Sequence, residues 1–324
     1  MLIRSFVLAL WRTDRPLTAV GIAMLCLLAA TAVALTVDPR QITGAPAWLK
    51  PAKFAASIAI YTFTLAWVFT YLPEWTKVRR VASWTTAITL VLEIVIIDLQ
   101  AWRGVASHFN VGTPLDGALF TLMGLAIVTQ TLASVAVAIA LWRQTFADRA
   151  LGWALRLAMT ITIVGAFFGG IMTRPTEQQM SEMKGGRVSV VGAHTVGAPD
   201  GGPGLPATGW SREHGDVRVP HFMGLHALQA LPLLALGTRR TRWSEARRVR
   251  LVLAASASYV SLLGVLLWQA LRGQSLLTPD ATTVAALVAW LASTLLLGLP
   301  VLLRALLRPR LQRQNAEALG DVAS

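Results

Sequence analysis

Eight apolar runs of about 17 to 25 residues divide this sequence, and they constrain its fold more than any other feature. A helical run of that length crosses a bilayer core, where backbone hydrogen bonds must be satisfied internally. Charged residues make up 14% of the chain, whereas a soluble domain carries about a quarter. The sequence therefore predicts an all-α, polytopic membrane helix bundle in contact with a lipid bilayer. The eight predicted spans are residues 17–37, 52–72, 81–102, 115–141, 150–172, 220–236, 251–271 and 282–303.

The basic residues indicate which side each loop faces. Assigning the loops alternately places 18 of them in short segments on one side and 10 on the other, five of those in one long loop. Because Lys and Arg hold short loops in the cytoplasm, both termini are predicted to be cytoplasmic. The net charge of +13 is thus attributed to topology, and no nucleic-acid partner is expected. The 18 residues are Arg4, Arg12, Arg15, Lys77, Arg79, Arg80, Arg143, Arg149, Arg239, Arg240, Arg242, Arg247, Arg248, Arg250, Arg304, Arg308, Arg310 and Arg313.

The first span has an alternative interpretation as a signal peptide, because basic residues precede it and residues 32–34 (Ala-Val-Ala) resemble a cleavage site. Its apolar stretch is longer than a typical signal core, which favours a retained helix. The single cysteine, Cys26, lies within this span and excludes an intrachain disulfide.

Short matches recur in the same order in the two halves of the chain. Gln-Ala-Trp-Arg-Gly at 100–104 and Gln-Ala-Leu-Arg-Gly at 269–273 are 169 positions apart, as are Pro51 and Pro220. Asp14 and Asp148 open similar tetrapeptides before spans one and five. We therefore predict two parallel four-helix repeats, at 1–145 and 146–310, with a long outer loop at 173–219 and a cytoplasmic tail at 311–324. The interface between such repeats is the natural place for a site.

Ionisable residues in the third span are the first candidates for chemistry. A charged side chain in a span costs about 2.5 to 3.5 kcal/mol on insertion scales and marks a functional candidate. Glu93 lies near mid-membrane and shares one helical face with Ile97 and Gln100, whereas Asp98 is about 140° away around the helix. Glu93, Asp98 and Arg103 are predicted to handle protons or anions. The alternative is that Glu93 is neutral or pairs with another helix.

Histidines supply the candidates for cofactor and metal binding. His221 and His226 are five residues apart in span six, so they point in different directions around that helix. They are predicted as haem or metal ligands, with Arg218 as an anion partner, and His108 and Asp216 complete the predicted divalent-metal set. An intramembrane histidine can instead act only as a hydrogen-bond partner between helices.

All five histidines fall on the predicted outer side, which indicates an outward-facing site. His194 and His214 lie in the long loop at 173–219, where a lone histidine is most often solvated. The length of this loop predicts either a lid or an irregular linker.

This layout resembles that of haem A synthase, an eight-span membrane protein of two similar four-helix halves with histidine haem ligands near the outer side. The runs at 103–108 and 216–229 also resemble those of uncharacterised bacterial multi-pass membrane proteins, which implies a bacterial plasma (inner) membrane. Three hypotheses follow. The first is a redox protein that depends on haem or a metal and has an outward-facing site. The second is a proton-coupled transporter using Lys53, Glu93 and Asp98, and the third is a non-catalytic membrane scaffold.

Overall fold

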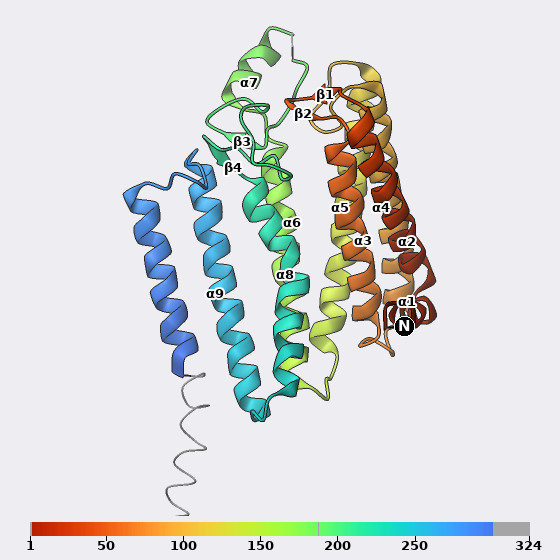
Figure 1. Ribbon diagram of the computed structural model, residues 1–324, viewed down its shortest axis with the longest axis vertical. Coiled ribbons are helices and arrows are strands. Elements are labelled where there is room, and N and C mark those ends of the chain that lie inside the picture. The colour runs from red at the N-terminus through yellow and green to blue at the C-terminus, as the bar shows by residue number, and fades with distance from the viewer. Residues whose placement is uncertain (1, 187, 301–324) are drawn as a thin grey trace, which may run out of the picture.

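The protein folds as a bundle of long helices in a computed structural model that describes residues 2–186 and 188–300. Eight helices are long and apolar enough to span a membrane, which confirms the prediction of an all-α, eight-span bundle. Figure 1 shows these helices side by side. The helices are α1 (Leu2–Thr13), α2 (Arg15–Val37), α3 (Leu49–Phe69), α4 (Thr76–Arg103), α5 (Pro114–Arg143), α6 (Arg149–Met172), α7 (Glu177–Lys184), α8 (Arg218–Gly237), η1 (Thr238–Arg240), α9 (Glu245–Leu271) and an unlabelled last span, Ala281–Pro300.

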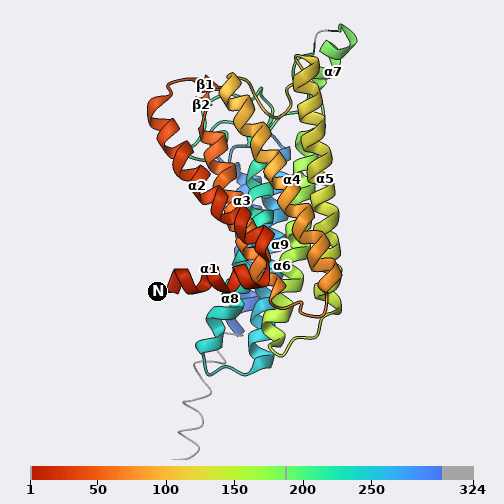
Figure 2. The same ribbon diagram turned by 90° about the vertical axis from the view of Figure 1, so that its right-hand side faces the viewer.

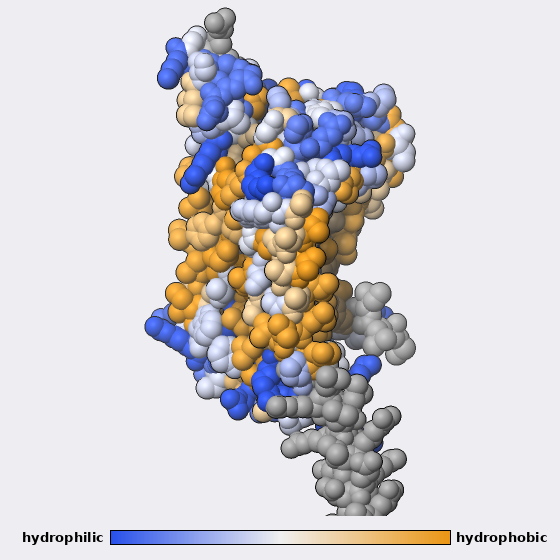
Figure 3. All heavy atoms as spheres, turned by 90° about the vertical axis from the view of Figure 1, so that its left-hand side faces the viewer, coloured by the Kyte–Doolittle hydropathy of each residue, from blue (hydrophilic) through white to orange (hydrophobic). Residues whose placement is uncertain are grey.

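The surface of the bundle has the polarity of an integral, multi-pass membrane protein. Figure 3 shows a broad hydrophobic band on one face, with hydrophilic residues gathered at both ends. Elsewhere on the bundle, Leu125, Val128 and Leu132 on α5 are 62%, 59% and 65% exposed. Aliphatic side chains exposed to that degree along a spanning helix are matched to lipid.

The helices extend beyond the predicted spans because their polar ends are helical too. α4 begins at Thr76, five residues before the predicted start, since its first turns carry Lys77 and Arg80. α9 likewise begins at Glu245 instead of residue 251. Hydropathy marks the part of a helix that lies in lipid, whereas the helix continues through the headgroup region. The predicted end of the last span, the cytoplasmic tail and the four arginines after residue 300 lie outside the described residues.

The helix α1 is not among the helices predicted from the sequence. α1 lies across the bundle at the end that carries the arginine-rich loops (Figure 2). Its Leu10 is buried, while Phe6 and Trp11 are half exposed beside Arg4 and Arg12. This pattern is typical of a helix that lies in the membrane interface.

Contacts at the arginine-rich end are matched between the two predicted halves. Asp14 caps α2 by accepting from Leu17 N, and Asp148 caps α6 by accepting from Leu151 N. Arg79 of α4 donates to the carbonyl of Thr13, and Arg248 of α9 donates to Asp148. Arg79 and Arg248 are separated by the 169 positions that relate the sequence matches. Such matched contacts are what a duplication would leave, and the duplication itself stays a prediction.

The opposite end of the bundle is covered by folded connections (Figure 1). A short hairpin follows α2, and the long loop at 173–219 contains α7 and a second small sheet that precedes α8. The loop is therefore packed onto the bundle end instead of forming an extended linker. Its paired strands are β1 (Gln41–Ile42) with β2 (Ala45–Pro46), and β3 (Thr195–Val196) with β4 (Gly215–Asp216).

Candidate functional site

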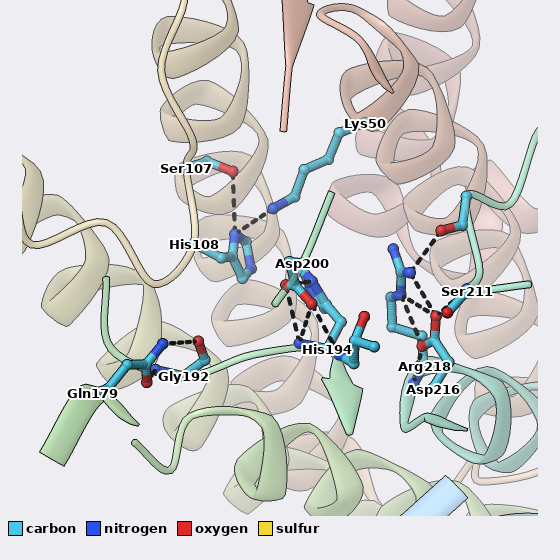
Figure 4. Close-up of polar contacts among 12 residues, drawn as sticks. Lys50, Ser107, His108, Gln179, Gly192, His194, Asp200, Ser211, Asp216 and Arg218 are labelled. Atoms are coloured by element: carbon cyan, nitrogen blue, oxygen red, sulfur yellow. Dashed lines mark hydrogen bonds and ion pairs between the residues drawn. The ribbon is translucent and has the colours of Figure 1, made fainter. Parts of the chain in front are cut away.

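Ionisable side chains gather beneath the long loop, at the end of the bundle opposite the arginine-rich loops. Figure 4 shows Lys50, His108, His194 and Arg218 among them. They come from α3, from the connection after α4, from the long loop and from the first turn of α8. The cluster thus draws on both predicted halves, as expected for a site at their interface.

The innermost contact joins Glu93 to His108. Glu93 is 1% exposed on α4, and its Oε1 lies 3.3 Å from Nε2 of His108. Ile97 and Gln100 are buried on the same helix, so the face that they are predicted to share with Glu93 points inward. Among the described residues, Oε2 of Glu93 makes no hydrogen bond. This carboxyl therefore has one oxygen joined to histidine and one free to take a proton.

The other side of the His108 ring meets Lys50, near the start of α3. Lys50 Nζ is 3.0 Å from His108 Nδ1, and the hydroxyl of Ser107 is 3.2 Å from the same nitrogen. A protonated lysine only donates hydrogen bonds, so Nδ1 accepts from Lys50. The ring proton is then on Nε2, the nitrogen that faces Glu93 at 3.3 Å. Lys50, His108 and Glu93 thus form a continuous chain of close polar contacts, which we call the relay.

The surroundings of His108 favour its neutral form. Burial lowers the pKa of His108 well below its ordinary value of 6.5, and the charge of Lys50 acts in the same direction. The ring also packs among aromatic side chains, with centroids 5.8 Å from Phe54, 6.2 Å from Phe109 and 6.4 Å from Phe120. The ring of His108 thus has a largely aromatic environment.

His194 and Asp200 form a second pair within the long loop. His194 Nδ1 lies 2.6 Å from Asp200 Oδ2, and Asp200 also accepts from the backbone N–H groups of His194 and Thr195. Burial raises the pKa of Asp200, but hydrogen bonds from His194 outweigh it, so this pKa is well below its usual value. Burial lowers the pKa of His194 despite its aspartate. The pair fixes the turn that follows β3, and His194 is paired with a carboxylate instead of being a lone loop histidine.

Two cations hold the long loop down over the relay. Lys53 Nζ donates to the carbonyl of Thr208 at 2.7 Å, and Arg218 Nη2 donates to the carbonyl of Gly209 at 2.6 Å. Gly209 has a left-handed backbone (φ +69°), a conformation that favours glycine. Arg218 also pairs with the buried carboxylate of Asp216 at 2.6 Å. The loop therefore forms a cover that is fixed at Thr208 and Gly209, and its function as a lid stays a prediction.

Arg103 and Asp98 lie outside the relay. Arg103 Nη1 is 2.6 Å from Asp116 Oδ1, and Gln100 Nε2 donates to the same oxygen at 2.8 Å. This pairing ties the end of α4 to the start of α5, where Thr113 caps the helix. Arg103 and Arg218 thus each have a carboxylate partner already. Asp98 is partly buried, and among the described residues its Oδ1 makes no hydrogen bond.

His221 and His226 face different neighbours. His221 Nδ1 lies 2.7 Å from the carbonyl of Gly165 on α6. A carbonyl only accepts, so the proton is on Nδ1 and Nε2 is left as a lone-pair nitrogen. His226 instead contacts Gln229 at 3.2 Å, and its ring lies 4.2 Å from that of Phe222.

The predicted metal ligands are engaged in separate contacts. His108 belongs to the relay, Asp216 pairs with Arg218, and His221 and His226 point apart. Over residues 2–186 and 188–300, no three His, Cys, Asp or Glu side chains gather closely enough to hold a metal ion. A metal site of these four residues stays a prediction.

Lys50 is the member of the relay that sequence reasoning missed. It stands directly before Pro51, outside the predicted second span, whereas the structure starts α3 at Leu49. A lysine one residue from the start of an apolar run is ordinarily an interfacial anchor. Its pairing with an imidazole 58 residues away leaves no local signal.

No family model, no curated protein and no solved structure matches the chain. The chemistry of this site is therefore inferred from its own residues.

Proposed function

We propose that this protein is a proton-coupled transporter of the bacterial plasma membrane, with the relay as its proton pathway. The observation that carries the proposal is the chain of close polar contacts from Lys50 through His108 to the buried Glu93. All three groups exchange protons, and consecutive atoms lie within 3.3 Å. A buried carboxyl within a span, such as Glu93, is typical of proton relays in membrane carriers.

A single transfer along the relay balances in atoms and charge. Lys50 gives a proton to His108 Nδ1 and becomes a neutral amine. His108 gives its Nε2 proton to Glu93 Oε1, and the imidazole stays neutral with its proton on Nδ1. One proton has then moved from an ammonium to a buried carboxylate, and the reverse steps restore the start. Histidine suits the middle position because its two nitrogens can exchange roles.

The orientation of the bundle supports an outward-facing entrance. The relay and the long loop are at the end opposite α1 and the arginine-rich connections (Figures 1 and 2). Because basic loops are retained in the cytoplasm, the relay end faces outward. Lys53 and Arg218 would then control access by holding Thr208 and Gly209 of the cover.

Proton flux in liposomes tests the proposal. The full chain is reconstituted with a pH-sensitive dye inside, and a membrane potential is imposed with potassium and valinomycin. We expect acidification faster than in empty liposomes, its loss in Glu93→Gln and a strong reduction in His108→Gln. Glu177→Gln, which removes an exposed carboxylate on α7, is the matched control and should leave the rate unchanged. Equal rates in all variants would contradict the relay and favour a non-catalytic scaffold.

A second candidate is a redox protein that binds haem or a metal, and His221 is the observation that favours it. A histidine that donates Nδ1–H to a carbonyl leaves Nε2 for a metal, as most metal-bound histidines do. The described residues supply this one nitrogen and not the paired ligands that a resemblance to haem A synthase implies, since His226 faces Phe222. An absorption spectrum with elemental analysis of the purified protein, compared with His221→Ala, tests this candidate.

A further inference from the structure

A groove of about 460 Å³ runs along the lipid-facing surface between α4 and α5. These two helices lie side by side (Figure 2). No residue of the relay or of the long loop lines the groove. Arg80, Trp84 and Ile88 line it from α4, and Thr129 lines it from α5. Its polar end is therefore at the arginine-rich end of the bundle.

The mouth of the groove carries unpaired positive charge. Within the described part of the chain, Arg80 makes no hydrogen bond or ion pair, unlike its neighbour Arg79, which donates to Thr13. Lys77 is exposed one turn earlier on the same helical face. No Asp or Glu lines the groove. The charge at the mouth is thus complementary to an anion.

The walls of the groove are apolar. Trp84 and Ile88 are 57% and 62% exposed along α4. The hydroxyls of Thr89 and Thr129 donate to the carbonyls of Thr85 and Leu125 in their own helices, each at 2.8 Å. With these hydroxyls satisfied, the threonines offer methyl groups to an occupant.

The length of the groove fits one acyl chain of a single leaflet. Arg80 and Ile88 are eight residues apart, a rise of about 12 Å along the helix. Half the hydrocarbon thickness of a bilayer is about 15 Å. Trp84 is one turn from Arg80, at the depth where tryptophan side chains collect in membrane proteins.

We propose that this groove binds an anionic phospholipid of the cytoplasmic leaflet. Arg80 and Lys77 hold the headgroup phosphate, whose negative charge no ammonium group of the lipid offsets, and an acyl chain lies along Trp84 and Ile88 against Thr129. A zwitterionic lipid of the same chain length lacks the net charge and binds more weakly. This site is independent of the proposed proton pathway.

Native mass spectrometry of the detergent-purified full chain tests the site, with phosphatidylglycerol and phosphatidylcholine of equal chain length as probes. We expect phosphatidylglycerol to be retained preferentially. The double variant Lys77→Gln with Arg80→Gln should weaken that retention about tenfold or more, since basic residues near a membrane surface attract anionic lipid. The matched control is Arg240→Gln with Arg242→Gln, which removes two exposed charges at the same end and should leave retention unchanged.

A second variant distinguishes the contribution of the groove's shape to lipid binding from the contribution of its charge. Thr129→Phe fills the groove without changing any charge and should reduce retention, whereas Leu125→Phe, on the same helix outside the groove, should not. Equal retention of the two lipids, or loss in the control double variant, would overturn the proposal. A dimer that dissociates in Thr129→Phe would also overturn it, by showing that a second copy covers the groove.

Discussion

His108 Nε2 lies 3.3 Å from Oε1 of Glu93, although one residue is in a connecting loop and the other is 1% exposed on a spanning helix. The contact brings a loop imidazole onto a carboxyl at membrane depth. Lys50 contacts the opposite ring nitrogen, so the partners of His108 indicate which of its two nitrogens carries the proton. The buried acid is therefore connected to the bundle end through one side chain.

The first prediction concerns the tautomer of His108. Nuclear magnetic resonance of protein labelled with 15N-histidine should show Nδ1 without a proton and Nε2 with one at neutral pH, because Lys50 donates to Nδ1. Lys50→Met removes that donor and should give a mixture of tautomers. Lys53→Met is the control, since Lys53 donates to the Thr208 carbonyl and not to the ring. A doubly protonated His108 at pH 7 would contradict the assignment.

The second prediction follows from the lowered pKa of His108. Burial lowers this pKa below the ordinary 6.5, so the unfolded chain takes up a proton at a pH where the native protein does not. Stability is thus full above pH 6.5 and falls as the pH decreases from 6.5 towards the lower native pKa. One such proton corresponds to about 1.4 kcal/mol per pH unit.

Thermal unfolding in detergent across pH 7 to 5 measures this slope. The melting temperature should fall on acidification, and His108→Gln should make the decline shallower. His214→Gln is the control, because His214 is a loop histidine outside the relay. This variant should show the same slope of melting temperature against pH as the native protein. A native melting temperature that is constant over this range would refute the assignment of a neutral, buried His108.

The third prediction concerns the cap of α6. Although burial raises the pKa of Asp148, hydrogen bonds from Arg248 and Arg239 hold it below the ordinary 3.8. Asp148→Ala removes the cap and leaves Arg248 without its carboxylate partner, which should cost about 2 kcal/mol of stability. Asp148→Asn keeps a capping oxygen and should cost less.

The effect of pH on the Asp148 variants gives an independent check. A carboxyl with a lowered pKa stabilises the protein above its unfolded value, so the contribution is present at pH 7 and is lost as pH falls below 3.8. The difference in melting temperature between native protein and Asp148→Asn should therefore shrink under acid. A difference that grows on acidification would argue against the ion pairs with Arg239 and Arg248.

The sequence is sufficient to predict the bundle, because spans in lipid are decided by local hydropathy and length. Helical periodicity also places Glu93 and Gln100 on one face of their helix, and that face is buried. These features depend on residues within a turn or two of each other. Local patterns therefore predict the fold and the part of the site that lies on α4.

The rest of the site depends on long-range pairing that local patterns do not encode. The partner of His108 on α3 is 58 residues away, and the residue that receives the Lys53 hydrogen bond is 155 residues away. The loop at 173–219 has no hydrophobic period that would predict its conformation. Its position is determined by contacts to its backbone, such as the hydrogen bond from Arg218 to the carbonyl of Gly209. α1 was missed because a twelve-residue helix is too short to register as a span.

The last prediction concerns the contact between α6 and α8, which positions His221. A Cβ on Gly165 would lie 2.6 Å from Cα of Gly224, and a Cβ on Gly224 would lie 2.5 Å from Cα of Gly165. Both neighbours are backbone atoms, so no side chain can move aside. Glycine at such a crossing lets the two backbones approach closely.

Gly165→Ala and Gly224→Ala should each separate these helices and lower stability by about 1 to 3 kcal/mol, as overpacking does in other cores. Gly264→Ala on α9, where an added Cβ meets nothing within 4 Å, should instead stabilise by up to about 1 kcal/mol through helix propensity. Melting temperatures of the three variants would thus move in opposite directions from the native value. In the first two variants the 15N resonance of His221 should also shift, because its Nδ1 donates to the carbonyl of Gly165. If all three alanines behave alike, then α6 and α8 do not meet at these glycines.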